Sequence, residues 1–524
     1  MGFLSFLKFI LKIVDPALSG LSLLVIILIC GCSSGKETYP VIDENFCAQI
    51  HLDSAHALSV QLDPFKDLML SKTGVYTLEE GDKAMVARAW LTESAEESID
   101  IQYFIFSADN IGLIAIDYLL RAADRGVKVR MLVDDIMVEA DAEDLMALDG
   151  HPNLSIRIYN PTANIGKNLP EKLYSLSKDF HGFNQRMHNK TFIVDQKVVI
   201  TGGRNIADEY FDYDHEYNFR DRDVLLIGEV TKDINKSFGE FWNSDLSVPL
   251  SDLFDAKNLD LNAEAKYDYI HQYACNPENF WPQVRDKIRS VPIAFKNIQD
   301  SGDLVWVDSV SFVSDKPGKN GEDGLKGGGL STDHLIDLIK KAKKSVYIQS
   351  PYLVTTELSQ RLFDEAVKRG VAVKILTNSM TSTDNLEAFS GYKRDRKKLL
   401  ETGIDIYEFK SDAAIRFKVM TGALQKEMDY TPIFGLHAKS MVVDEAIAVI
   451  GTFNLDPRSA NLNTECVAVV YDSTIARNLY TAMQEDMKPE NAWHTTLEFN
   501  PDDEAGWWKQ FSIWLRGVVP KSIL

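Results

Sequence analysis

Two stretches of the sequence carry the same chemically active residue types at the same spacing. Residues 187–205 read MHNKTFIVDQKVVITGGRN, and residues 436–454 read LHAKSMVVDEAIAVIGTFN. The shared residues are His188, Lys190, Asp195, Gly202 and Asn205 in the first copy, and His437, Lys439, Asp444, Gly451 and Asn454 in the second. One His-x-Lys pair is usually surface decoration, but five matched positions in two copies indicate a single site built from both.

Each copy predicts a β-hairpin that begins at its histidine. Side chains at i and i+2 of a strand face the same way, so the His and the Lys of each copy share one face. Asp195 and Asp444 fall where the hairpin turns, which predicts a structural role as hydrogen-bond acceptors or ion-pair partners. Asn205 and Asn454 follow the returning strand and emerge beside the His-Lys pair.

Two copies brought together surround one cavity with two imidazoles, two ammonium groups and two amides. This set suits a phosphodiester, because Lys and Asn can hold the non-bridging oxygens and stabilise the charge of the transition state. One neutral His can attack phosphorus and form a phosphohistidine, while the other, when protonated, can donate to the departing oxygen. The expected phosphate-binding residues are Lys190, Asn205, Lys439 and Asn454, and no metal ion or cofactor is expected.

Each hairpin is preceded by a repeated strand–helix–strand pattern. Residues 98–106 (SIDIQYFIF) and 345–354 (SVYIQSPYLV) read as strands, and each is followed by a helical pattern that ends at an Arg-Gly pair. Gly126 and Gly370 suit the left-handed residue after a helix. The strands that follow are mostly apolar, as expected for strands covered on both faces. The chain is therefore predicted to be α/β, with two similar domains, each a mixed β-sheet flanked by helices.

The two stretches resemble the signature of the phospholipase D superfamily, His-x-Lys-x4-Asp-x6-Gly-x2-Asn, which occurs in two copies per active site. The segments GGRNIADEYF, FRDRDV and GTFNLDPRSANLNTE are similar to the bacterial cardiolipin synthase branch, in its cardiolipin synthase C-like subgroup. The resemblance covers about residues 77–524. It implies two phospholipase D-type domains related by a pseudo-twofold axis, with a metal-free active site at their junction.

The resemblance also implies a role for individual residues. It makes His188 the nucleophile and His437 the general acid, and it counts both lysines and both aspartates of the motifs with the catalytic set. In this superfamily an acidic residue downstream of each motif orients a histidine. Glu465 fits this position after the second copy, and Asp221 is favoured over Asp223 after the first.

The implied reaction is phosphatidyl transfer, most simply the synthesis of cardiolipin from phosphatidylglycerol and a second phospholipid. The motif alone leaves phospholipase D-type hydrolysis open, and the sequence does not choose phosphatidylethanolamine or phosphatidylglycerol as donor or decide whether a partner protein is needed. A net charge of −21 argues against nucleic acid as the substrate, because phosphate binding requires a basic face. A non-catalytic lipid-binding protein would be expected to have lost part of one motif, and neither copy has.

The N-terminus has the features of a secretory signal. Lys8 and Lys12 precede an apolar run, and residues 29–32 resemble a bacterial lipobox, which would place a lipid on Cys32. The alternative is an uncleaved membrane anchor over about residues 17–32. Either reading predicts a protein held at a membrane of the bacterial cell envelope, with its catalytic domains outside the cytoplasm.

The sequence divides into six predicted segments. They are a signal or anchor (1–32), an N-terminal extension (33–76), a first phospholipase D-like domain (77–300), a linker or loop (301–330), a second such domain (331–495) and an amphipathic C-terminal segment (496–524). The last segment has aromatic and basic residues near helical spacing, which suits either a bilayer interface or a helix that caps the core. Cys47, Cys275 and Cys466 are predicted to be isolated thiols, with one disulfide as the alternative.

Overall fold

The computed structural model describes most of the chain after the predicted signal. The described residues are 46–49, 56–135, 140, 142–161, 185–255, 262–280, 282–319, 327–420 and 431–524. Residues Glu44–Leu524 form one compact unit, and Met1–Asp43, with the predicted lipidation site Cys32, lie outside the described residues. None of the described helices has the length and apolar character needed to cross a membrane.

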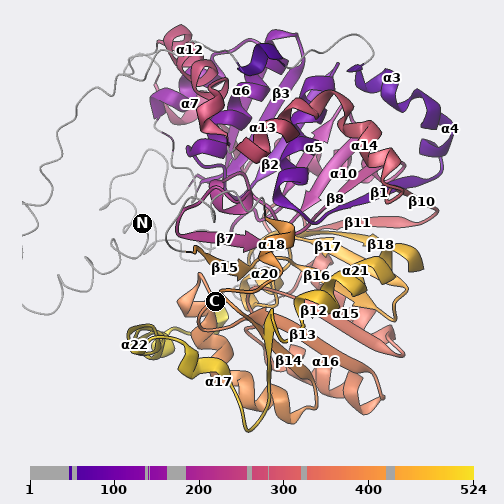
Figure 1. Cartoon of the computed structure of the whole chain (residues 1–524), viewed down its shortest axis with the longest axis vertical. Coiled ribbons are helices and arrows are strands. Elements are labelled where there is room, and N and C mark those ends of the chain that lie inside the picture. Colours follow the sequence, from indigo (N-terminus) through magenta and orange to yellow (C-terminus); the bar gives the residue numbers. More distant parts are fainter. Residues whose placement is uncertain are drawn as a thin grey trace, which may run out of the picture. The chain divides into compact units, whose positions relative to one another are not determined.

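The described residues contain two large mixed β-sheets (Figure 1). The first consists of β1 Thr73–Leu78, β2 Ser98–Tyr103, β3 Lys128–Asp134, β4 Leu154–Tyr159, β5 Thr191–Val194, β6 Val198–Gly202, β8 Asp223–Gly228, β9 Ser247–Pro249 and β10 Val305–Val307. The second consists of β11 Val310–Ser314, β12 Ser345–Gln349, β13 Ala372–Asn378, β14 Asp405–Phe409, β16 Ser440–Val443, β17 Ile447–Gly451, β18 Cys466–Val470 and β19 Ala492–Thr495.

The strand orders of the two sheets correspond element by element. The first runs β10-β1-β8-β6-β5-β2-β3-β4-β9, and the second runs β11-β18-β17-β16-β12-β13-β14-β19. Apart from β10, each strand of the first sheet has a counterpart in the second. In both sheets the three strands of the strand–helix–strand part are parallel to one another, and the first strand of the hairpin, β5 or β16, is antiparallel to its neighbour β2 or β12. This confirms the prediction of two similar α/β domains.

The crossover helices are defined at both ends by their sequence. Helix α6, Asn110–Asp124, begins after Asp109, whose side chain accepts a hydrogen bond from the N–H of Gly112. Its counterpart α16, Glu357–Lys368, begins with a capping box formed by Thr356. Gly126 and Gly370 follow the two helices with φ of 97° and 86°, a conformation that glycine adopts without steric cost.

The other α-helices of the described residues pack against the sheets or against one another. In the first half they are α3 Leu58–Leu62, α4 Lys66–Met69, α5 Gly81–Ser94, α7 Ala142–Asp149, α10 Thr231–Trp242, α11 Leu250–Leu253, α12 Ala263–Ala274, α13 Pro282–Arg289 and α14 Ala294–Asp300. In the second half they are α15 Leu330–Lys341, α17 Leu386–Glu401, α18 Arg416–Val419, α20 Pro457–Asn461, α21 Ser473–Asp486 and α22 Trp507–Leu515.

The two halves share an apolar core, which explains why they form one unit. Phe238 and Trp242 of α10 belong to the same buried cluster as Leu479 and Met483 of α21. The same cluster includes buried side chains from both sheets. A third, two-stranded sheet also joins the halves, because β7, Tyr217–Arg220, pairs in parallel with β15, Ile433–Leu436 (Figure 1).

The segment 301–330, predicted to be a linker or surface loop, instead contributes to both sheets. Its strand β10 pairs with β1 of the first sheet, and β11 pairs with β18 of the second. Beyond β11, Asp315 is buried and accepts a hydrogen bond of 3.0 Å from the N–H of Glu465. Past β11 the segment is polar and Gly-rich, and its buried residues Asp315 and Lys319 form an ion pair, which a search for hydrophobic periodicity does not detect. Residues 320–326 lie outside the described part.

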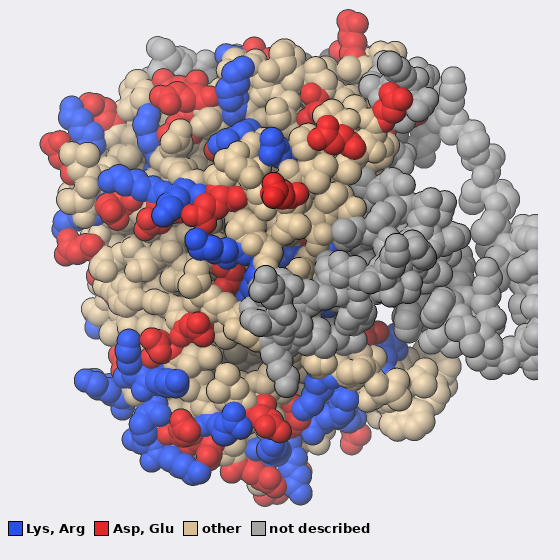
Figure 2. Space-filling view, turned by 180° about the vertical axis from the view of Figure 1, so that it is seen from behind, with Lys and Arg blue, Asp and Glu red and all other residues tan. Residues whose placement is uncertain are grey.

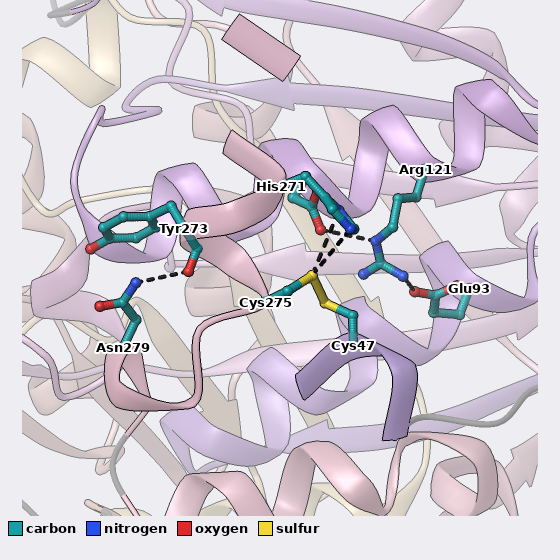
Figure 3. The surroundings of a disulfide bond; sticks show 8 residues. Cys47, Glu93, Arg121, His271, Tyr273, Cys275 and Asn279 are labelled. Atoms are coloured by element: carbon teal, nitrogen blue, oxygen red, sulfur yellow. Dashed lines mark hydrogen bonds and ion pairs between the residues drawn. A yellow bond between two sulfur atoms is a disulfide. The ribbon is translucent and has the colours of Figure 1, made fainter. Parts of the chain in front are cut away.

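Two of the cysteines form a disulfide (Figure 3), the alternative that the sequence left open. Cys47, in the short 3-10 helix Phe46–Gln49, is bonded to Cys275 at the end of α12, 228 residues along the chain. Closing a loop of this length lowers the entropy of the unfolded chain and stabilises the fold by about 5 kcal/mol. Cys466 is a buried free thiol.

Candidate active site

Both motif histidines lie in short segments that precede a strand. The sequence predicted strands beginning at the histidines, but β5 begins at Thr191 and β16 at Ser440. The backbone of each histidine is instead held by the other half of the chain. The N–H of His188 donates to the carbonyl of Thr464 at 3.0 Å, and the N–H of His437 donates to the carbonyl of Arg220 at 2.8 Å. The two motifs therefore meet at the junction of the halves.

His188 of the first copy is paired with a carboxylate of the second half. Its Nδ1 lies 2.8 Å from Oε2 and 3.1 Å from Oε1 of Glu465. The hydroxyl of Ser459 donates to the same carboxylate at 2.6 Å, and the hydroxyl of Thr452 donates to it as well. A carboxylate fixed in this way orients the ring, because the Nδ1–H of His188 is directed toward it.

His437 of the second copy is paired with a carboxylate of the first half. Its Nδ1 lies 2.6 Å from Oδ2 of Asp221. Asp223, the other candidate in that segment, instead pairs with the guanidinium of Arg88 at 2.9 Å and lies near Arg204. Each histidine is thus contacted by an acidic residue from the opposite half, a crossing that the sequence did not predict.

The two motif lysines are placed differently. Lys190 donates to the backbone carbonyl of its own histidine, His188, at 2.8 Å. The ammonium of Lys439 donates to the carbonyl of His437 at 2.6 Å and also lies 2.7 Å from Nδ1 and 2.9 Å from Nε2 of that ring. Among the described residues, Nε2 of His188 has no hydrogen-bond partner, whereas Nε2 of His437 faces a cation.

Burial and neighbouring cations set the charge state of the site. Burial lowers the pKa of His188 to about 4 and that of His437 to about 3, with the nearby lysines acting in the same direction. Burial also lowers the pKa of Lys190 to about 7 and that of Lys439 to about 8. Both imidazoles are therefore neutral at pH 7 in the protein alone, and neutral imidazole is the nucleophilic form.

The site also contains aromatic residues that the sequence analysis did not single out. The ring of Phe104 lies 5.1 Å from that of His188, and the rings of Tyr210 and Phe219 lie 5.1 and 4.6 Å from that of His437. Tyr352 donates to the carboxylate of Asp384 at 2.8 Å. Phe104 and Tyr352 come just after β2 and β12, but at different positions of the repeat, so the matched spacing of the two halves did not indicate them.

The motif asparagines differ in their surroundings. Asn205 accepts from the N–H of Ile105 at 3.1 Å and donates to the hydroxyl of Tyr210 at 2.8 Å. These two hydrogen bonds join Asn205 to the segment after β2 and to Tyr210, and a phosphate contact through the second N–H of its amide stays a prediction. The Oδ1 of Asn454 is buried without a hydrogen-bond partner among the described residues. A phosphate contact would use the N–H groups of this amide, and it stays a prediction.

The motif aspartates lie at the hairpin turns, away from the histidines. Asp195 accepts hydrogen bonds from the N–H groups of Glu96, Glu97 and Ser98. Asp444 accepts from three consecutive N–H groups of residues 343–345 in the second half. Both adopt a positive φ, 49° and 55°. Their placement matches the structural role expected from the spacing and not a contact with substrate.

The comparisons with known proteins agree with this architecture. The family described as "Cardiolipin synthase, PLD-like domain" matches residues 91–242 and 335–487, one match in each half. The chain is 34% identical to "Cardiolipin synthase C" of Escherichia coli strain K12 over 415 residues, covering 77% of this chain and 82% of that relative. It is 33% identical over 423 residues to an uncharacterized protein of Helicobacter pylori strain J99, covering 80% of each.

A solved structure shows the same fold. The phosphatidylserine synthase of Haemophilus influenzae superposes with a TM-score of 0.55 at 15% identity, covering 88% of this chain and all of that one. Fold, paired motifs and sequence similarity together define a two-domain enzyme of the phospholipase D superfamily. Within it, the chain belongs to the family of cardiolipin synthase PLD-like domains.

Proposed function

We propose that the protein is a phosphatidyltransferase that makes cardiolipin from phosphatidylglycerol and a second phospholipid, through a phosphohistidine on His188. One observation carries the assignment of roles. The lone pair on Nε2 of His188 has no partner among the described residues, while Nε2 of His437 lies 2.9 Å from the ammonium of Lys439. The first ring is ready to attack phosphorus and the second is ready to receive and pass on a proton.

In the first step Nε2 of His188 forms a bond to phosphorus and the bond from phosphorus to the departing alcohol breaks. Lys190 and Lys439 offset the charge on the non-bridging oxygens. The departing oxygen takes a proton from the pair of His437 and Lys439, with His437 as the general acid. A phosphate anion in the site favours the charged form of both groups, which offsets the low pKa that burial gives His437.

In the second step a hydroxyl of another phospholipid attacks the phosphorus. His437 accepts the hydroxyl proton, the new phosphorus–oxygen bond forms, and the bond to Nε2 of His188 breaks. Both histidines are buried and bordered by aromatic rings, which limits the access of water. This enclosure, together with the relatives' names, supports transfer to an alcohol over transfer to water.

We also infer that the enzyme is held at a membrane of the cell envelope by its N-terminus, through a lipid on Cys32 or an uncleaved anchor, with the catalytic unit outside the cytoplasm. The disulfide between Cys47 and Cys275 supports this location, because such bonds persist in oxidising compartments. Mass analysis of the mature N-terminus distinguishes a diacylated Cys32 from an uncleaved leader. Cys47 and Cys275 recovered as free thiols from cells would contradict the location.

The reaction is tested by incubating the purified full chain with isotopically labelled phosphatidylglycerol, with and without phosphatidylethanolamine, and identifying the lipid products by mass spectrometry. Cardiolipin with release of glycerol or ethanolamine is the expected result, and the leaving alcohol identifies the donor lipid. Phosphatidic acid as the sole product would make the enzyme a hydrolase. Product formation by His188→Ala at the wild-type rate would refute the assignment of the site.

A further inference from the structure

The C-terminal helix α22 presents an apolar surface to solvent. Trp507 and Trp514 are 73% and 72% exposed, which is unusual for the largest apolar side chains of a protein. The exposed members of the surface, which we call the α22 face, are Trp507, Trp508, Phe511, Trp514, Leu515 and Val518. On the other side of the helix Ile513 is buried in the core of the second half.

The polar residues around α22 fasten it to helix α17 and leave the α22 face uncharged. Arg516 pairs with Glu387 at 2.7 Å, and Lys521 pairs with Asp395 at 2.7 Å. Arg394 of α17 donates to the carbonyls of residues 517 and 519. Seen from behind in Figure 2, the projection at the lower right where α22 lies is tan, without Lys, Arg, Asp or Glu. The cations are thus already paired, and the face is apolar rather than basic.

The helix is also tied to the catalytic cavity. The ammonium of Lys509 donates to the carbonyls of Thr381 and Thr383, at 3.1 and 3.2 Å. The next residue, Asp384, accepts from Tyr352 and is influenced electrostatically by Lys439 of the site. The α22 face therefore lies on an element that is hydrogen-bonded to the segment carrying Asp384, a carboxylate within electrostatic reach of Lys439.

We propose that the α22 face inserts into the surface of a lipid bilayer and holds the catalytic cavity against the lipids that it uses. Tryptophan and phenylalanine prefer the boundary between headgroups and acyl chains. With nine residues the helix is about 14 Å long, less than half of the roughly 30 Å hydrocarbon core, so it lies in the membrane plane. The inference deepens the proposed function and rests on it for the identity of the lipids.

Because the cations around α22 are already paired, the proposed attachment depends on insertion of apolar side chains and not on charge. Insertion through uncharged aromatic residues does not depend on anionic headgroups, unlike attachment through a basic patch, which weakens as salt screens the charges. We expect the contact between α22 and lipid to be the same in vesicles of phosphatidylcholine and of phosphatidylglycerol, and to change less than twofold between 0.05 and 0.5 M salt.

The contact is tested with the full chain reconstituted into vesicles that contain radiolabelled phosphatidylcholine. A photoreactive benzoylphenylalanine replaces Trp514 and, in a control protein, replaces Leu358, an exposed apolar residue of α16. After irradiation we expect the protein substituted at Trp514 to carry at least tenfold more cross-linked radiolabelled lipid than the protein substituted at Leu358. Equal labelling of the two proteins, or cross-links from residue 514 to protein in place of lipid, would overturn the proposal.

A second measurement separates this inference from the proposed reaction. The triple variant Trp507→Ala, Trp508→Ala, Trp514→Ala is compared with Leu358→Ala on bilayer phosphatidylglycerol and on a short-chain, monomeric analogue. We expect the ratio of bilayer to monomer activity to fall at least tenfold in the triple variant alone, and an unchanged ratio would overturn the inference. If instead the wild type makes no transfer product from either substrate, the proposed reaction is wrong. The cross-linking experiment still tests the contact between α22 and the bilayer.

Discussion

The two copies of the motif share a backbone plan but differ at the reacting atoms. In the first copy Lys190 donates to the carbonyl of His188 and not to its ring, and the ring nitrogen opposite Glu465 has no partner among the described residues. In the second copy the ammonium of Lys439 lies against the ring of His437. The repeated fold supplies two imidazoles, and the lysine positions assign them different tasks.

The comparison also shows how the halves depend on each other. Each histidine is oriented by a carboxylate from the opposite half, so neither half contains a complete acid–base pair. Breaking a pair in one half therefore changes the chemistry of the histidine in the other. Four predictions test how the two copies differ and how they depend on each other, in decreasing order of the expected effect.

The largest difference is expected between the two histidine variants on a substrate with a good leaving group. With the 4-nitrophenyl ester of phosphatidic acid, His188→Ala should lose at least about 10³-fold in nitrophenol release, because no covalent intermediate can form. His437→Ala should keep a burst of one nitrophenol per enzyme, because this leaving group needs no proton, and then stall. Rapid-quench kinetics measure the burst, and an acid-labile phosphorus–nitrogen bond identifies the intermediate. A burst in His188→Ala and none in His437→Ala would reverse the roles.

The next effect is expected from the crossed carboxylates. Glu465→Gln should behave like the His188 variant and lose the burst, while Asp221→Asn should behave like the His437 variant and keep it. Each should lower kcat by about 10²- to 10⁴-fold, as when a carboxylate that orients a catalytic histidine is neutralised. Asp223→Asn is the matched control, because this carboxylate pairs with Arg88 and not with a histidine. It should lower the melting temperature but leave the burst. Loss of the burst in Asp221→Asn and its retention in Glu465→Gln would show that the pairs do not cross.

A smaller effect is expected in the pH dependence of kcat/KM. His188 must be neutral, and its pKa is about 4, so activity is present above pH 4 and lost as the pH falls through it. Lys190 and Lys439 must be protonated, and their pKa values are about 7 and about 8, so activity is lost as the pH rises through this range. Lys439→Arg should move the alkaline limb upward, since a guanidinium stays charged, even though the overall rate falls. An unmoved limb would assign it to another group, with Lys190 the first candidate, since the site titrates as a coupled set.

The smallest effects are expected at the hairpin turns. Asp195→Asn should cost about 1–3 kcal/mol of unfolding free energy, because this buried carboxylate accepts three backbone hydrogen bonds, whereas Asp444→Asn, at a more exposed turn, should cost less than about 1 kcal/mol. Burial opposes the backbone hydrogen bonds, which nevertheless lower the pKa of Asp444 below its usual 3.8. Its contribution is therefore present above pH 3.8 and lost as the pH falls through the lowered value. Urea unfolding at several pH values measures the loss of unfolding free energy in each variant and its pH dependence. A change in the pH profile of activity in either variant would contradict a purely structural role for that aspartate.

The C-terminal helix and the interdomain core give a second contrast. Phe238 and Trp242 of α10 are buried between the halves, whereas the tryptophans of α22 remain exposed. Aromatic content alone did not distinguish these outcomes, and the sequence left both a bilayer interface and a cap of the core open for the C-terminal segment. The structure shows α22 with one buried residue, Ile513, and an exposed aromatic face.

The sequence by itself determined the elements and the reacting groups. Local periodicity and helix-stop residues specify strand, helix and strand in each half, and the matched spacing of the two copies identifies His188, Lys190, His437 and Lys439. These features depend on neighbours within a few positions, which is why they can be read along the chain. The polar segment around Asp315 is a loop, but its burial was not predicted, because that burial depends on hydrogen bonds to distant residues.

Only the tertiary structure decided which carboxylate serves which histidine. The pair of His188 and Glu465 spans 277 positions, and that of His437 and Asp221 spans 216. No local pattern encodes such contacts, because they depend on how the two sheets and helices α10 and α21 pack around a common core. The asymmetry between the two lysines has the same origin, since the position of a buried ammonium follows from the groups that surround it and not from its place in the motif.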